Sequence, residues 1–113
     1  MSDLATIQRR NALIAANRVR STRHEVKQQI RSVGTLEGSM RAAADVLETA
    51  PVELDTMRVE ALLQAVYRLG PSKASRMLTQ ARIPLSRSVG ALTRRQRSAL
   101  VELLRDYKGG ANG

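Results

Sequence analysis

The sequence predicts an all-α protein, with a long basic N-terminal helix followed by a small helical bundle. Apolar residues recur at helical spacing in five segments. The apolar residues are Leu, Val, Ile, Met and Ala, without any Phe or Trp, a composition that suits packed helices. No β-hairpin signal occurs between the segments. A length of 113 residues corresponds to one domain, with no room for a separate catalytic domain.

The first predicted helix covers about residues 3–33 and begins at a cap formed by Ser2 or Asp3. Its sequence is rich in Ala, Arg, Gln and Leu and has no Pro or Gly before Gly34. At 1.5 Å per residue such a helix extends roughly 45 Å. Its second half carries an apolar stripe that we expect to dock on the core: Val19, Val26, Ile30 and Val33. Because the first half is poorer in apolar residues, we expect an arm that projects from the core.

A basic stripe runs along the same helix, with Arg20, His24, Lys27 and Arg31 on one face. A charged stripe is usually only a solvated helix face. Here, however, Glu25 is the sole acidic residue of the segment after Asp3, so the stripe lacks acidic partners. We therefore predict that Arg20, Lys27 and Arg31 contact a polyanion, with Arg9, Arg10 and Arg18 further along the arm.

Two helices are predicted next, in the acidic middle of the chain. Residues 35–50 form the first, which Pro51 ends. Residues 56–67 form the second, behind a cap at Asp55.

Two more helices follow in the basic C-terminal part. Residues 71–81 form one, with Pro71 at the favoured first helical position. Residues 94–107 form the other, which begins with a capping box made by Thr93 and Gln96. Glycines after this helix stop it.

The chain therefore divides into three parts. Residues 1–34 are the arm, residues 35–107 are the helical core that binds the polyanion, and residues 108–113 are a flexible tail.

Charge follows the same division. Residues 1–34 carry seven Lys or Arg and two acids, residues 35–70 three and six, and residues 71–113 nine and two. The resulting charges of +5, −3 and +7 sum to the net charge of +9. A surface this basic attracts polyanions, so nucleic acid is the expected partner and both ends of the chain are expected to bind it.

Other classes of function find little support in the sequence. No apolar run is long enough to cross a membrane and no signal peptide begins the chain, so a cytoplasmic location is expected. Without cysteine, and with His24 as the single histidine, we expect no metal site and no cofactor. The carboxylates are interspersed with core positions and join no catalytic pattern, so we expect no enzyme. Tyr67 and Tyr107 are the only aromatic residues, which disfavours a reader of unstacked bases.

A tight turn that leads into a helix, at residues 69–74, is the most informative stretch. The free amides of a helix start, the positive end of its dipole, the Ser72 hydroxyl and the Lys73 ammonium converge there after Gly70. A Gly-Pro pair is also a common way to start a helix. The neighbouring amphipathic helix and Arg76 favour a phosphate site formed by Gly70, Ser72 and Lys73. We expect a larger side chain at Gly70 to harm stability and binding if its φ is positive or if a phosphate approaches it.

A second basic cluster follows that helix. It comprises Arg82, Arg87, Arg94, Arg95 and Arg97. Two of its members, Arg94 and Arg95, lie in the first turn of the last helix, where they oppose the helix dipole at a cost of about 0.3–1 kcal/mol at low salt. An anion over this helix start would explain them.

The second half of the chain contains a series of strings in a fairly specific order and spacing: Met57 to Leu63, Leu69-Gly70, Lys73-Ala74, Ile83, Arg87, Leu92 and Arg95 to Leu100. Together they resemble the actinobacterial integration host factor family, whose members carry a helix-two-turns-helix module. Upstream, Glu25 to Lys27, Ile30-Arg31 and Gly34 resemble the end of the family's long basic N-terminal helix.

The resemblance implies a nucleoid-associated architectural protein that binds double-stranded DNA with little sequence preference, bends it and assists a phage integrase. It also implies that Gly70 and Lys73 line the phosphate-binding turn and that Arg87 contacts the backbone. Relatives tend to have further arginines just after Arg87, where this chain has Ser88 and Gly90. We expect Arg94 and Arg95 to take their place. The protein is expected to be a monomer in solution.

Three alternatives remain. Helix-two-turns-helix elements also bind structured RNA, so an RNA-binding or ribosome-associated module is the main one. An amphipathic membrane-surface protein would need a stronger apolar face on the first helix. A glycosylase or nuclease built on the same module would need a catalytic residue in an additional domain.

Overall fold

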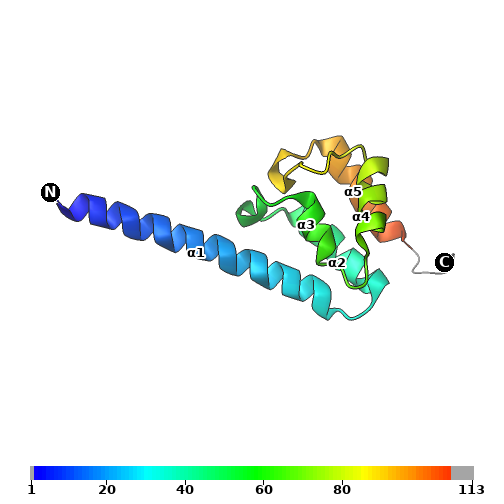
Figure 1. Ribbon diagram of the computed structural model, residues 1–113, viewed down its shortest axis with the longest axis horizontal. Helices are drawn as coiled ribbons and strands as arrows, with labels where there is room; N and C mark the ends of the chain where they lie inside the picture. The colour runs from blue at the N-terminus through cyan, green and yellow to red at the C-terminus, as the bar shows by residue number, and fades with distance from the viewer. Residues whose placement is uncertain (1, 108–113) are drawn as a thin grey trace.

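The computed structural model describes residues 2–107, in which five α-helices and two short 3-10 helices follow one another. The first helix, α1 (Ser2–Ser32), projects as a rod from a bundle formed by the other elements, as Figure 1 shows. The molecule measures 65 × 28 × 21 Å as a result. The predicted all-α class and long N-terminal helix are confirmed, while the predicted flexible tail, residues 108–113, lies outside the described residues.

The C-terminal half of α1 docks on the bundle and the N-terminal half does not. Val26 and Ile30 are buried, Val19 is half-buried, and residues 3–18 are exposed. The prediction that Val33 also docks is wrong, because its side chain is 45% exposed. The helix ends at Ser32, so Val33 lies in the turn after it, next to Gly34 with a φ of 82°, and does not continue the docked face of the helix.

Helix α2 (Leu36–Thr49) has the ends that its sequence predicts. The Thr35 hydroxyl caps it by accepting a hydrogen bond from the Gly38 amide at 3.2 Å. Ala50 ends it in the left-handed region, with a φ of 45°, and its amide donates to the Val46 carbonyl. Pro51 follows and cannot continue the helix.

The next predicted helix, residues 56–67 with a cap at Asp55, is wrong at its start and three residues too long at its end. The structure has a 3-10 helix, η1 (Val52–Leu54), for which Asp55 is the C-cap residue, and then a short helix, α3 (Val59–Gln64). The chain is extended at Arg58, which forms an antiparallel bridge with Ser88. The Val59 amide donates to the Arg87 carbonyl at 3.0 Å, and the Val89 amide to the Met57 carbonyl at 2.8 Å. These long-range bonds outweigh the local helical preference.

The C-terminal half contains helix α4 (Pro71–Gln80), the 3-10 helix η2 (Val89–Ala91) and helix α5 (Arg94–Asp106). Both α-helices end within one residue of their predicted bounds. The predicted capping box is present: the Gln96 amide donates to the Thr93 hydroxyl at 3.1 Å, and the Thr93 amide donates to the Gln96 side chain at 3.0 Å.

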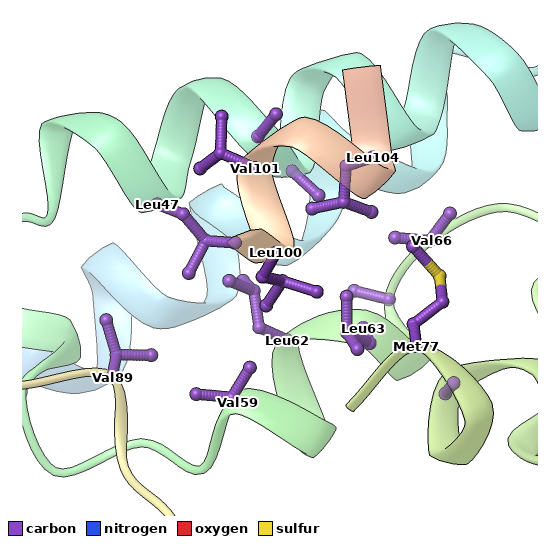
Figure 2. Close-up of a cluster of buried hydrophobic side chains, with 14 of the residues drawn as sticks. Leu47, Val59, Leu62, Leu63, Val66, Met77, Val89, Leu100, Val101 and Leu104 are labelled. Carbon is purple, nitrogen blue, oxygen red and sulfur yellow. The ribbon is translucent and has the colours of Figure 1, made fainter. Parts of the chain in front are cut away.

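One apolar core joins the elements of the bundle, as Figure 2 shows. Leu47 of α2, Leu62 and Leu63 of α3, and Leu100 of α5 are fully buried in it. Each such side chain stabilises the fold by about 1.5–3 kcal/mol relative to an exposed position. The core fixes both ends of α4 and the start of α5, where the candidate binding residues lie.

Candidate nucleic-acid interface

The turn before α4 holds three predicted phosphate-binding residues: Gly70, Ser72 and Lys73. Gly70 is the N-cap residue of the helix and Pro71 its first residue, and no side chain within residues 2–107 caps this start. The amides of Ser72 and Lys73 lie in the first helical turn, where the helix supplies no acceptor for them. Their side chains are exposed. The turn thus presents two amides, a hydroxyl and an ammonium group to solvent, as a phosphate site requires.

Gly70 does not have a positive φ. Its φ of −75° is open to any residue, and the left-handed conformation of this turn falls on Arg68, with a φ of 59°. A Cβ atom added at Gly70 would meet nothing within 4 Å. The expectation that a larger side chain there strains the backbone is therefore wrong. Only the close approach of a ligand remains as a functional reason for glycine at this position.

Arg87 lies in the connection between α4 and α5, where the main chain is held on both sides. Its amide donates to the Pro84 carbonyl and its carbonyl accepts from the Val59 amide, both at 3.0 Å. The side chain is half-buried. The guanidinium therefore extends from a rigid backbone, which suits a contact made at a fixed position.

Ser88 and Gly90 serve the fold in this chain. Ser88 belongs to the bridge with Arg58. A Cβ atom at Gly90 would lie 3.0 Å from the Cα of Asp55, and the Gly90 amide donates to the Asp55 carbonyl at 2.9 Å. An arginine at residue 90 would have to displace the main chain next to η1.

Arg94 and Arg95 are exposed in the first turn of α5. The side-chain amide of Gln96 donates to the carbonyl of Arg82 at 2.8 Å, which joins the end of α4 to the start of α5. Arg82 itself is exposed, with a φ of 59°. This bond gathers Arg82, Arg94 and Arg95 around one helix junction.

Arg97, which the sequence placed in the same basic cluster, is committed to the fold instead. Its guanidinium donates to the main-chain oxygens of Leu47, at 2.6 Å, and Val89, at 3.2 Å. The side chain is half-buried. Sequence spacing carries no signal for this role, because both acceptors are main-chain atoms on other elements.

The two basic groups lie at opposite ends of α4, which is labelled in Figure 1. Gly70, Ser72 and Lys73 are at its start, and the arginines of the helix junction follow its end. Ten helical residues separate them by about 15 Å. They cannot contact one phosphate, but they can contact phosphates on either side of a DNA groove, since the major groove is about 12 Å wide.

The hydrogen bonds of two side chains, Ser39 and Arg23, fix α1 relative to the two basic groups. The Ser39 hydroxyl donates to the Ile30 carbonyl at 2.6 Å and accepts from the Tyr67 amide at 2.8 Å, so it joins the end of α1 to the turn before α4. At the other end of the docked part, Arg23 donates to the Glu53 carbonyl at 3.0 Å and to the Thr56 hydroxyl, next to η1. The docked part of α1 thus connects to both ends of the candidate surface.

The predicted basic stripe of α1 is exposed along this docked part. Arg20, His24, Lys27 and Arg31 all have exposed side chains. The stripe lies about 100° around the helix from the docked residues Val26 and Ile30. Among residues 2–107, the ion pairs involve only Arg41 and Arg105 as cations, so these basic side chains are not neutralised.

The opposite charge gathers on α2 and α5. Arg105 forms ion pairs with Glu48 at 2.7 Å and Asp45 at 2.8 Å. The hydrogen bond to Glu48, and to a smaller extent that to Asp45, raises the pKa of Arg105. A surface groove of about 790 Å³ along α5 is lined by both charges: the carboxylates of Glu48, Glu102 and Asp106, and the guanidinium groups of Arg94, Arg97 and Arg105. Carboxylates repel phosphate, so only the border of the groove at Arg94 belongs to the candidate interface.

Neither a metal-binding cluster nor a membrane span occurs within residues 2–107. No group of three or more His, Cys, Asp or Glu side chains there could hold a metal ion. No described helix combines the length and the apolar character needed to span a bilayer.

Comparison with known proteins gives consistent results. Residues 36–104 match the family described as the S13-like H2TH domain. Two similar proteins are both named integration host factor. The one from Mycolicibacterium smegmatis is 34% identical over 102 residues and the one from Mycobacterium tuberculosis is 33% identical; each match covers 90% of this chain and 93% of the relative.

A solved structure is also similar, with a TM-score of 0.61 and 25% sequence identity. It is that of sIHF bound to an 8 bp palindromic DNA, and the match covers 79% of this chain and 96% of that one. About a fifth of this chain therefore has no counterpart there.

Proposed function

Because this chain belongs to the actinobacterial integration host factor family, with an H2TH domain at residues 36–104, we propose that it is an architectural protein that binds double-stranded DNA. The observation that carries the proposal is the set of exposed basic side chains, free of ion pairs among the described residues, at both ends of α4 and along α1. The solved relative bound to DNA supports the choice of duplex DNA.

The proposed contacts are to phosphates rather than to bases. Lys73, Arg87, Arg94 and Arg95 lie on a helix start or on a connection, and helix starts and basic side chains are typical phosphate ligands. Phosphate contacts position a protein on DNA and carry no sequence information directly. Binding should therefore depend little on sequence.

Bending is the expected consequence for the DNA. Exposed basic side chains lie on the bundle and on the helix that projects from it (Figure 1), and we propose that the duplex bends to contact both. The additional phosphates that a bent duplex brings to the protein can offset the cost of bending, which is of order 1–6 kcal/mol for 40–90° over 20–30 bp.

We propose that the chain is a monomer in solution, that it resides on nucleoid DNA, and that it assists a phage integrase by shaping the duplex. Sedimentation of the free protein tests the first point. Recombination between two attachment-site duplexes, with and without the protein, tests the last.

A salt series on duplex DNA tests the main proposal. If five to seven phosphates are neutralised, the logarithm of the binding constant should fall against that of the salt concentration with a slope of roughly −4 to −6. A scrambled duplex of equal length should bind equally well. A slope shallower than about −2 would contradict backbone binding. Tighter binding to duplex RNA than to duplex DNA would favour the RNA-binding alternative.

A further inference from the structure

Tyr107, far from Lys73 in the sequence, contacts its side chain in the fold. The Lys73 ammonium donates a hydrogen bond of 3.2 Å to the Tyr107 hydroxyl and lies 5.7 Å from the centre of its ring. Lys73 is the third residue of α4, and Tyr107 directly follows the last residue of α5. The contact therefore joins the start of one helix to the end of another, 34 residues later.

The fold fixes Tyr107 more firmly than it fixes Lys73. The tyrosine ring is half-buried and packs against the apolar core, whereas the lysine side chain is exposed. A free lysine samples many rotamers, and a partner held by the core reduces that freedom before any ligand arrives. The end of α5 also carries a partial negative charge, which favours a cation beside it.

We propose that Tyr107 is a positioning residue that presents the Lys73 ammonium to a DNA phosphate at the start of α4. An ammonium group has three N–H donors. The hydroxyl oxygen of Tyr107 takes one of them, and two remain for phosphate oxygens. This inference rests on the proposed function, and it gives Tyr107 a role beyond the core.

The test compares the wild type with Tyr107→Phe, Lys73→Ala and the double variant on one duplex across a salt series. Tyr107→Phe keeps the ring and removes only the hydroxyl, so the thermal midpoint should stay the same. Affinity should fall about three- to tenfold, as expected when one more flexible side chain must be ordered on binding. The salt slope should not change, because no charge is lost.

Lys73→Ala and the double variant complete a double-mutant cycle. Its slope should become shallower by about 0.9, the value for one phosphate contact. Adding Tyr107→Phe to it should change affinity by less than twofold, because the hydroxyl would act only through Lys73. Tyr67→Phe removes the other tyrosine hydroxyl of the chain and should bind like the wild type.

The outcomes separate this inference from the proposed function. If the wild type shows the steep salt slope and Tyr107→Phe binds equally well, the role of Tyr107 is wrong and DNA binding stands. Equal losses from Tyr107→Phe with and without Lys73 would also overturn it. A wild type that does not bind duplex DNA would overturn both.

Discussion

The guanidinium of Arg97 donates a 2.6 Å hydrogen bond to the main-chain oxygen of Leu47, so an arginine within a basic cluster acts as a bond between α5 and α2. Its second bond, to the Val89 oxygen, extends the link to η2. Arg94 and Arg95, three and two residues earlier, are exposed. Neighbouring arginines in one helix thus have separable roles.

Arg97→Ala should therefore reduce stability. The change leaves two carbonyl oxygens without their charged donor, which costs about 2–3 kcal/mol of unfolding free energy. Denaturant unfolding measures this loss. Arg41→Ala is the control, because Arg41 is exposed and its ion pair with Glu37 spans 3.9 Å; this change should cost less than about 0.5 kcal/mol. Equal stability of the two variants would contradict the role of Arg97.

Ser39→Ala should destabilise the fold and loosen the arm. Ser39 is fully buried, and its loss leaves the Ile30 carbonyl and the Tyr67 amide without this partner. An unsatisfied buried group costs about 1–3 kcal/mol, so we expect a total loss of about 2–4 kcal/mol. Amide hydrogen exchange should rise in residues 26–32 before the rest of the core. Ser32→Ala is the control, since its exposed hydroxyl bonds only to the Gln29 carbonyl within the same helix.

The elements that the sequence predicted well are those with local signals. Thr93 and Gln96 lie three residues apart and form the capping box of α5, and the ring of Pro71 fixes a φ that suits the first residue of α4. The start of α3 was predicted wrongly because Arg58 pairs with Ser88, thirty residues away. A local pattern contains no information about such a bond.

The candidate site divides in the same way. The exposure of Arg20, Lys27 and Arg31 follows from helical spacing alone. The roles of Arg23 and Arg97 do not, because their acceptors are mainly main-chain oxygens brought close by tertiary packing. Nor could the sequence distinguish Tyr107 as a core residue from Tyr107 as a partner of Lys73.

Reversing the charge of the α1 stripe should separate DNA binding from folding. The triple change of Arg20, Lys27 and Arg31 to Glu should weaken duplex binding at least tenfold at low salt. The thermal midpoint should hardly change, because exposed charges contribute little to stability. Arg23→Ala should instead lower the thermal midpoint, since the Arg23 guanidinium donates hydrogen bonds to the Glu53 carbonyl and the Thr56 hydroxyl. Unchanged affinity of the triple variant would show the stripe to be only a solvated face.

Two glycines offer a matched pair. Gly70→Val should leave the stability of the free protein within about 1 kcal/mol, because its φ is ordinary and a Cβ meets no atom within 4 Å. DNA affinity should nevertheless fall, since the new side chain would stand where a phosphate approaches the Ser72 and Lys73 amides. Gly90→Val should instead lower the unfolding midpoint through its contact with Asp55. Normal DNA binding by Gly70→Val would exclude a close phosphate approach at this turn.

The start of α5 provides the sharpest test of how this chain differs from its relatives. Ser88 and Gly90 serve the fold here, so we expect Arg94 and Arg95 to supply the phosphate contacts of this region together with Arg87. The double variant Arg94→Ala, Arg95→Ala should weaken duplex binding at least as much as Arg87→Ala does. Its salt slope should become shallower by about 1.8, the value for two phosphates.

The same double variant should be slightly more stable in the absence of DNA. Two positive charges at a helix start oppose the dipole, and their removal should raise the unfolding free energy by about 0.3–1 kcal/mol at low salt. The control, Arg41→Ala with Arg105→Ala, removes equal charge from the face where both arginines pair with carboxylates. If the control weakens binding as much as the double variant does, net charge alone governs affinity. If the Arg94 and Arg95 variant binds normally, the contact surface lies mainly on α1 and on the turn at Gly70.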